Sequence, residues 1–160
     1  MVTHNKQFLA IGQMKKDTFM KYIYVLSLVL FSVTVRAATL EIEISGITQK
    51  GVLDLAIYSS KKVFESDRAD KPGPQPGIVA GSIKNIDTEV YKETFEIPAG
   101  TYAVGYYVDA NENEELDTNF FGIPKEEYGF SNNVRGKFGP PTFESASFNL
   151  DAYHKLRLEI

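Results

Sequence analysis

Short runs in which apolar and polar residues alternate constrain the fold of this chain more than any other feature. In residues 39–45, three aliphatic residues alternate with two glutamates, Glu41 and Glu43. Successive side chains of a β-strand point to opposite faces of the sheet, so this period of two indicates a strand with one buried face and one wet face. Gly46 ends the run.

Similar segments follow along the chain, each bounded by glycine, proline, asparagine or aspartate. They are rich in β-branched and aromatic residues, which favour strands, and no helical period of useful length occurs after residue 37. The predicted strands are 39–45, 52–59, 78–86, 91–97, 101–108, 145–150 and 155–160.

About seven short strands separated by turns predict an all-β fold, an antiparallel β-sandwich of the immunoglobulin-like or transthyretin-like type. The turn signal at 49–51 predicts a hairpin between the first two strands, and residues 151–154 are expected to join the last two. Val63 and Phe64 are expected to pack on the core as a short helical turn. The proline-rich remainder of 60–77 is expected to be a surface loop.

The segment before residue 38 has the layout of an export signal. Residues 22–35 form an apolar run of about fourteen residues, three lysines precede it between residues 15 and 21, and small residues occupy 35 and 37. We therefore predict a signal peptide with an N-terminal extension over 1–37, a single domain over 38–160, and a periplasmic or secreted protein. A retained anchor is the less favoured alternative, because a bilayer needs roughly twenty residues, and residues 38–160 hold no predicted transmembrane span.

Charge and cysteine content exclude several classes of function. The chain has 17 Lys and Arg and 21 Asp and Glu; five and one of these precede Ala38, which leaves a net charge of −8 after it. Nucleic acid is not an expected partner, because phosphate binding needs clustered basic residues. With no Cys, disulfides, thiolate metal sites and a Cys nucleophile are excluded.

One acidic segment carries most of the chemistry that the sequence suggests. Residues 109–117 read Asp-Ala-Asn-Glu-Asn-Glu-Glu-Leu-Asp. Calcium binds six to eight oxygens from carboxylates, amides and backbone carbonyls, and side chains at positions 1, 3, 5 and 9 of such a loop converge on one point. The predicted calcium ligands are the side chains of Asp109, Asn111, Asn113 and Asp117 and the backbone carbonyl of Glu115.

This segment departs from the EF-hand loop at two positions. Glu114 stands where that loop has glycine for a sharp turn, and Phe120 stands where it has a bidentate glutamate. The site is therefore expected to follow a strand and to borrow ligands, with Glu126 and Glu127 as candidates. The alternative is an acidic turn whose Asp and Asn side chains only accept hydrogen bonds from backbone amides.

The chain also resembles a known bacterial family, domain of unknown function 2141. The resemblance rests on the 109–119 motif, then Phe-Gly-Ile-Pro at 121–124, Glu-Tyr-Gly-Phe-Ser-Asn-Asn at 127–133, Pro-Pro-Thr-Phe at 140–143, Ala146, and the earlier 97–104 segment. It implies an exported β-sandwich over nearly all of the chain after the leader and implies no settled activity. Glu114 departs from the glycine expected after the second asparagine.

Residues 121–143 combine aromatic rings with amides and glycines. One interpretation is structural, with aromatic rings fixing a long loop and amides bonding backbone groups. The other is a small-ligand or glycan cleft, because long loops are often functional. Its lining would be Tyr128, Phe130, Asn132 and Asn133. The structural interpretation is favoured.

The favoured function is an exported, non-enzymatic binding or interaction domain stabilised by calcium, with an unknown protein or glycan as its ligand. One alternative is a carbohydrate-binding module that uses exposed tyrosines such as Tyr106, Tyr107 or Tyr128. Another is a hydrolase that uses paired carboxylates from Asp109, Asp117, Glu126 and Glu127. His154 has no nucleophile motif around it, so a Ser-His-Asp arrangement is not expected.

Overall fold

The alternating run at the start of the domain forms the central strand of one sheet. The computed structural model describes residues 36–67, 69, 77–136 and 139–160. Strand β1 (Ala37–Ser45) buries Leu40, Ile42 and Ile44 completely. It pairs antiparallel with β4 (Val90–Pro98) and parallel with β8 (Tyr153–Glu159), which gives a three-stranded sheet in the order β4-β1-β8.

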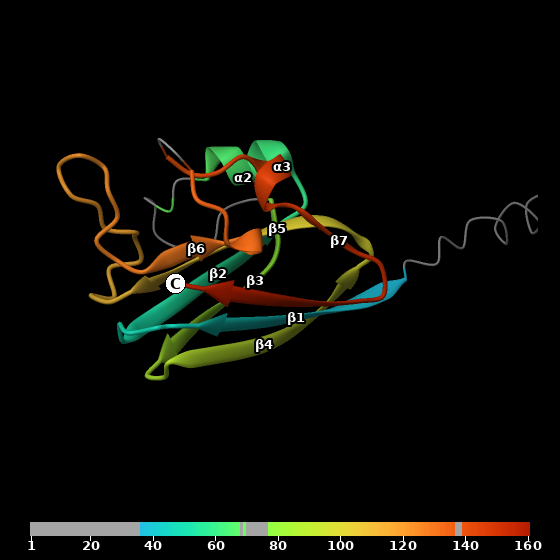
Figure 1. Cartoon of the computed structure of the whole chain (residues 1–160), viewed down its shortest axis with the longest axis horizontal. Helices are drawn as coiled ribbons and strands as arrows, with labels where there is room; N and C mark the ends of the chain where they lie inside the picture. The colour runs from blue at the N-terminus through green and yellow to red at the C-terminus, as the bar shows by residue number, and fades with distance from the viewer. Residues whose placement is uncertain (1–35, 68, 70–76, 137–138) are drawn as a thin grey trace, which may run out of the picture. The chain divides into compact units, whose positions relative to one another are not determined.

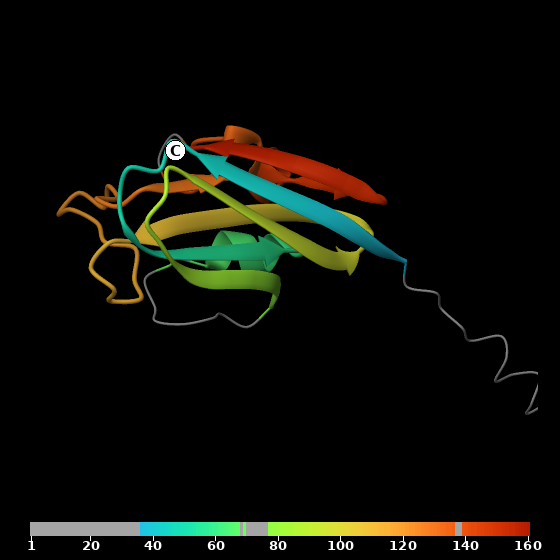
Figure 2. The same cartoon turned by 90° about the horizontal axis from the view of Figure 1, so that it is seen from below.

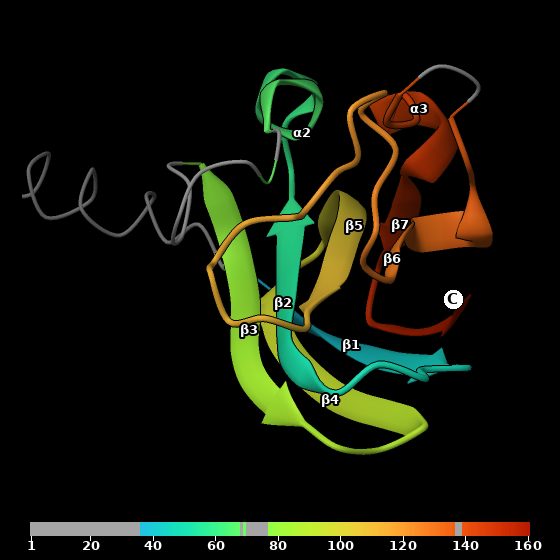
Figure 3. The ribbon, with the colours of Figure 1, turned by 90° about the vertical axis from the view of Figure 1, so that its left-hand side faces the viewer.

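The second sheet has five strands. Its order is β3 (Ile78–Ile86), β2 (Gly51–Tyr58), β5 (Gly100–Asp109) and β6 (Tyr128–Phe130), and β7 (Phe148–Leu150) pairs with the start of β5. Figure 3 shows β3, β2, β5 and β6 side by side, and Figures 1 and 2 show the two sheets as stacked layers.

Two apolar clusters cover the two faces of the five-stranded sheet. The larger lies between the sheets and joins the aliphatic residues of β1 and β2 to Tyr102, Val104 and Tyr106 of β5. The smaller lies on the outer face, where the short helices α2 (Lys61–Ser66) and α3 (Phe143–Ala146) pack with the 3-10 turn η1 (Ser131–Asn133). Its aromatic centre is Phe64, whose ring makes edge contacts with Tyr58, Phe130 and Phe143.

Residues 36–160 form one compact unit that contains both sheets and both clusters. All the described strands pair within it. We therefore expect residues 36–160 to fold without the preceding segment. Residues 1–35, which make up most of the predicted signal peptide, lie outside the described residues.

The predicted β-sandwich is confirmed, as is the short helical turn at Phe64. The predicted hairpin between the first two strands is wrong, because β1 and β2 belong to different sheets and residues 46–50 cross between them. The last two strands are joined by residues 151–152, but β7 pairs with β5 and β8 with β1, and part of the predicted 145–150 strand is helical. The proline-rich part of the predicted 60–77 loop lies mostly outside the described residues.

The register places several loops at one end of the sandwich. Val52 of β2 lies opposite Asp109 of β5, and Ser45 of β1 lies opposite Val90 of β4. The 46–50 crossing, the β3–β4 turn and the long β5–β6 loop therefore meet at this end, while the described chain begins at the other end (Figure 1). None of the helices in the described part of the chain has both the length and the apolar character needed to span a bilayer.

The parallel β1–β8 pair is held on its wet face by a charge ladder. Lys155 Nζ lies 2.6 Å from Glu41 Oε1 and 3.0 Å from Glu43 Oε2. The hydrogen bond from Lys155 is the main reason that the pKa of each glutamate lies below its ordinary value. A carboxylate with a lowered pKa in the folded state adds stability above its ordinary pKa, and this contribution is lost as the pH falls.

We expect Lys155→Gln to lower the melting temperature of residues 36–160 at pH 7. The difference from the parent should shrink as the pH falls below 4.5, the ordinary value for these glutamates, because both then become neutral. Thermal unfolding followed by circular dichroism between pH 3 and pH 7 measures this. Lys62→Gln, on the exposed face of α2, is the matched control. If the difference in melting temperature between Lys155→Gln and the parent did not change with pH, Lys155 would not stabilise the fold through the two glutamates.

Candidate functional site

The acidic loop begins at the last residue of β5. Asp109 is only 2% exposed, and its carboxylate turns forward over the loop that follows. Oδ1 accepts a hydrogen bond from the N–H of Asn113 at 3.2 Å, and Oδ2 accepts one from the N–H of Glu114 at 2.7 Å. The first predicted ligand therefore closes the loop around itself, as a carboxylate that bonds amides four and five residues ahead.

The other predicted ligands converge on Asp117. Asn111 Nδ2 donates to Asp117 Oδ2 at 2.8 Å, and Asn113 Nδ2 donates to Asp117 Oδ1 at 3.4 Å. The two amide oxygens accept backbone N–H groups two residues ahead, Asn113 N–H at 3.2 Å and Glu115 N–H at 3.0 Å. The structure thus brings together the four predicted side chains, closed by internal hydrogen bonds.

The loop makes its sharp turns without glycine. Glu112 and Glu114 have φ angles of 59° and 64°, in the left-handed region that glycine adopts most easily. Glu114 is the position at which the spacing of the motif calls for glycine. The chain therefore keeps the turn there and carries the backbone strain of a non-glycine residue.

Glu126 braces the base of the loop. This carboxylate is buried, and its two oxygens accept the N–H groups of Ala110 and Asp117, both at 2.9 Å. It joins the first and last turns of the loop from a residue nine positions beyond Asp117. Both carboxylate oxygens are engaged with backbone, so Glu126 acts here as a support for the loop.

Glu127 fixes the crossing between the sheets. Its Oε1 accepts from Thr48 Oγ1 at 2.5 Å, and its Oε2 accepts from the N–H of Gln49 at 3.2 Å. Its own N–H donates to Gln49 Oε1 at 2.9 Å. The second predicted extra ligand thus ties the 46–50 segment to the acidic loop.

Negative charge gathers beneath the loop, on the outer face of the five-stranded sheet. The sequence places Asp54 on the wet face of β2, but the structure leaves it only half exposed. Burial is the main cause of a raised pKa for Asp54, and the negative charges of Asp67 and Asp109 raise it further. Burial also raises the pKa of Tyr107, with contributions from Asp54, Asp109, Glu126 and Asp67.

Tyr128, Asn132 and Asn133 take structural roles. The Arg135 guanidinium lies 5.0 Å from the centre of the Tyr128 ring. Asn132 Nδ2 donates to the carbonyls of Ser145 and Ser147 at 3.1 and 2.9 Å. The Asn133 side chain bonds the backbone of β8 twice. Its Nδ2 donates to the Arg157 carbonyl, and its Oδ1 accepts the N–H of Glu159. After β6 ends, the side-chain amides of Asn132 and Asn133 therefore provide the hydrogen bonds that hold this segment to its neighbours.

The expectation of exposed tyrosines is wrong for Tyr106 and Tyr107, because both are buried. Tyr106 packs in the main core, over Gly129, where a Cβ atom would lie 2.3 Å from the tyrosine oxygen. Burial raises the pKa of Tyr106 to about 12. The alternation along β5 correctly placed Tyr106 and Tyr107 on opposite faces of the sheet. It did not predict that other parts of the chain cover both faces.

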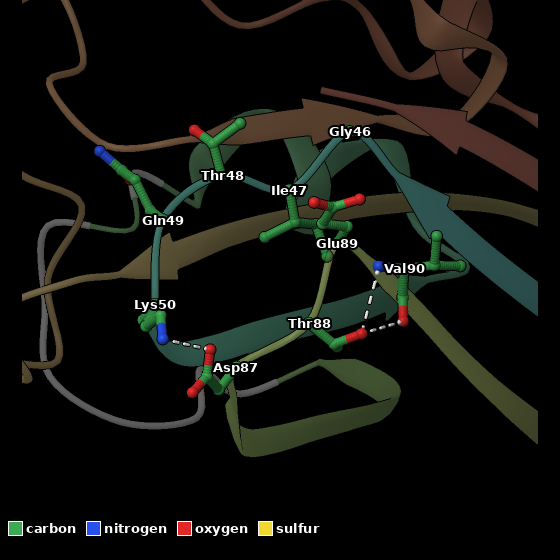
Figure 4. Close-up of a pocket in the computed structure, with 9 residues that line it drawn as sticks. All are labelled: Gly46, Ile47, Thr48, Gln49, Lys50, Asp87, Thr88, Glu89 and Val90. Carbon is green, nitrogen blue, oxygen red and sulfur yellow. Dashed lines mark hydrogen bonds and ion pairs between the residues drawn. The ribbon is translucent and has the colours of Figure 1, made fainter.

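A pocket of about 670 Å³ opens between the 46–50 crossing and the 87–90 turn (Figure 4). Lys50 Nζ and Asp87 Oδ1 form an ion pair of 2.6 Å at its rim, and Thr88 Oγ1 bonds the backbone of Val90. Both partners of the ion pair are mostly exposed, and such pairs contribute little free energy. This ion pair therefore offers no strong anchor for a ligand.

Over the described residues, no three Asp, Glu, His or Cys side chains are close enough to hold a metal among themselves. The donor set of the loop is instead two carboxylates and two carboxamides. In the same part of the chain, the ion pairs involve Lys50, Lys61, Lys84, Lys92 and Lys155, and none of them includes an acid of the 109–117 loop.

Residues 42–156 match a bacterial family described as "Uncharacterized protein conserved in bacteria (DUF2141)". The chain belongs to the DUF2141 family. The match confirms the resemblance stated from the sequence, and it spans both sheets and the acidic loop. No curated protein and no solved structure gives a significant match to this DUF2141 chain.

Three contributors to this end of the DUF2141 domain were not singled out from the sequence as site residues. Asp54 and Asp67 carry the charge beneath the loop, and Asn119 caps the turn that follows it. Asn119 had a signal, because Asn followed by Gly three residues later is typical of a capped turn. The two aspartates had none, since their neighbours are distant in sequence.

We expect Glu114→Gly to stabilise the domain by about 0.5–1 kcal/mol, because glycine relieves the cost of the left-handed backbone but loses more entropy on folding. The matched control is Glu115→Gly, at a position without a positive φ. This control should destabilise by a similar amount. Urea unfolding of residues 36–160 measures both. Equal effects of the two substitutions would show that Glu114 is not strained.

We expect Asp54→Asn to raise the melting temperature at pH 7 in the presence of a chelator. A raised pKa in the folded state means that Asp54 adds stability below pH 3.8, its ordinary pKa, and that this is lost as the pH rises through the folded value. The gain from Asp54→Asn should therefore be largest at pH 7 and small near pH 3. Asp87→Asn, on an exposed turn, is the control; a pH-independent gain from Asp54→Asn would refute the assignment.

Proposed function

We propose that this DUF2141 chain is an exported, non-enzymatic interaction domain whose 109–117 loop binds one calcium ion. The observation that carries the proposal is the convergence of Asp109, Asn111, Asn113 and Asp117 around one short loop, within hydrogen-bond distance of each other or of shared amides. The export half of the proposal rests on the leader at 1–37, of which residues 1–35 lie outside the described residues.

The chemistry of the donor set fits calcium. Calcium accepts carboxylate, carboxamide and backbone oxygens in a flexible shell, and the loop supplies two of each side-chain kind. A carboxamide oxygen has two lone pairs, so Asn111 and Asn113 can each accept a backbone N–H and still bind a metal. The ion would take the place of the Asn111 and Asn113 side-chain N–H groups, which now donate hydrogen bonds to the Asp117 carboxylate.

The surrounding charge also favours a cation. Five of the nine residues from 109 to 117 are acidic, and none of the ion pairs in the described part of the chain includes them. Asp54 and Asp67 add negative charge beneath the loop, and burial together with the charges of Asp67 and Asp109 raises the pKa of Asp54. A divalent ion would lower this repulsion. In the proposed site, Glu126 and Glu127 position the loop, the Glu115 carbonyl is the fifth ligand, and bidentate carboxylates or water supply the remaining oxygens.

The competing functions have weaker support. Of the three tyrosines expected to bind carbohydrate, Tyr106 and Tyr107 are buried and Tyr128 is only partly exposed. The hydrolase alternative named four carboxylates. Asp109, Glu126 and Glu127 each accept two or more hydrogen bonds from backbone amides, and Asp117 accepts two from asparagine side chains, so all four act in holding the loop. Binding without catalysis is therefore the better supported class.

The test is calcium titration of chelator-treated residues 36–160 by calorimetry, with the melting temperature followed in parallel. We expect one site with a Kd of roughly 10⁻⁴ M, typical of extracellular modules. A hundredfold excess over this Kd should stabilise the fold by about 2.7 kcal/mol. Asp117→Asn keeps the shape of the side chain but removes its charge, and it should weaken binding at least tenfold.

The control is Asp87→Asn, which removes an acid from a neighbouring turn and should leave calcium binding unchanged. Magnesium, which demands a smaller octahedral shell, should bind less tightly than calcium. Absence of heat and of a thermal shift in the parent domain would identify the loop as an acidic turn held by its own hydrogen bonds.

A further inference from the structure

The turn that follows the acidic loop exposes an unusual amount of apolar surface. Phe120 is 97% exposed, Phe121 83% and Ile123 59%. The described residues expose seven large hydrophobic side chains, and three of them fall within these four positions. Single exposed hydrophobics are ordinary, but a contiguous group marks a contact surface. We call residues 119–124 the apolar tip.

The exposure is built into the backbone of the tip. Asn119 N–H donates to the Ile123 carbonyl at 2.8 Å, and Gly122 N–H donates to the Asn119 carbonyl at 2.9 Å. The Asn119 side-chain oxygen accepts the N–H groups of Phe121 and Ile123 at 2.9 and 3.1 Å. A bridge between Thr118 and Pro124 closes the base. These bonds hold the side chains outward, away from the core.

We propose that the apolar tip inserts into the interfacial region of a phospholipid bilayer. This role goes beyond calcium binding and does not depend on it. The two phenylalanine rings, 5.5 Å apart at their centres, and Ile123 form one small apolar knob at the loop end of the sandwich. Aromatic and aliphatic side chains of this kind enter the boundary between headgroups and acyl chains.

The area of the knob favours a lipid surface over a protein partner. An aromatic side chain buries about 150–250 Å², so three side chains offer roughly 500 Å². A stable protein interface needs about 800 Å² from each partner. Insertion into a lipid surface needs no such minimum area, because lipids rearrange around the side chains that enter.

The backbone of the tip also suits an interface that is poor in water, because most of its amides are paired. An unpaired N–H group costs several kcal/mol in lipid, so an inserted segment must satisfy its own amides. Of the five N–H groups of the tip, those of Asn119, Phe121, Gly122 and Ile123 are paired within it, and that of Phe120 is left for a headgroup oxygen or water at the interface. Pro124 has no N–H to satisfy. A protein partner would not require this internal pairing.

Charge selects the type of lipid. The tip begins beside Asp117, whose carbonyl accepts the N–H of Lys125, and Glu114 and Glu115 lie in the same acidic loop. Anionic headgroups would repel these acids. The expected surface is therefore zwitterionic, and phosphatidylcholine vesicles are the appropriate probe.

The absence of tryptophan gives a direct test, because a single introduced tryptophan is the only one in the chain. Phe120→Trp in residues 36–160 places the reporter at the most exposed position of the tip. Its fluorescence should shift to the blue as phosphatidylcholine vesicles are added, with chelator present. The parallel reporter Tyr153→Trp, on β8, should not shift.

Adding Phe121→Ser to the Phe120→Trp domain should weaken vesicle binding at least tenfold, because it removes one apolar side chain that the bilayer would bury. Adding Ile83→Ser, an exposed hydrophobic on β3, should leave binding unchanged. Circular dichroism checks that each variant is folded. Absence of a blue shift, or an equal loss from both serine substitutions, would overturn the proposal. A shift that depends on protein concentration without lipid would also overturn it, and would assign the tip to a second copy.

Discussion

The apolar contact between the inner faces of the two sheets is the constraint on which the rest of the structure depends. Leu40, Ile42 and Ile44 of β1 pack in the same cluster as the inner residues of β2 and β5. A slip of one residue would turn Glu41 and Glu43 into this core, so the register is strongly fixed. Because register fixes where each strand ends, it also fixes which loops meet at the end that holds the candidate site.

The position of the first proposed ligand follows from that register. Asp109 lies opposite Val52, and the neighbouring Gly51 approaches the Asp109 carbonyl so closely that a Cβ atom would lie 2.1 Å from its oxygen. Only glycine permits this approach at φ 149°. The end of β5 is thereby held against the start of β2. Asp109 can then direct its carboxylate into the loop.

Local patterns predicted the strands and the spacing of the acidic loop, because period and spacing are properties of adjacent residues. The turn signal at 49–51 could not tell a hairpin from a crossing between sheets, which depends on the distant partners β4 and β8. The burial of Tyr107 and Asp54 also depends on segments that cover the outer face of the sheet. For the same reason, the sequence could not show that Glu126 accepts hydrogen bonds from both ends of the loop.

The acidic loop and the apolar tip share one means of construction, in which asparagine oxygens accept backbone N–H groups two residues ahead. Asn111 and Asn113 do this in the loop, and Asn119 does it in the tip. Such bonds hold a backbone in shape without neighbouring strands, so charged and apolar groups can be displayed beside each other. Asp117 lies three residues before Phe120, and a charged group resists entry into lipid. In the proposed membrane contact, insertion therefore stops at the tip, and the association is shallow and reversible.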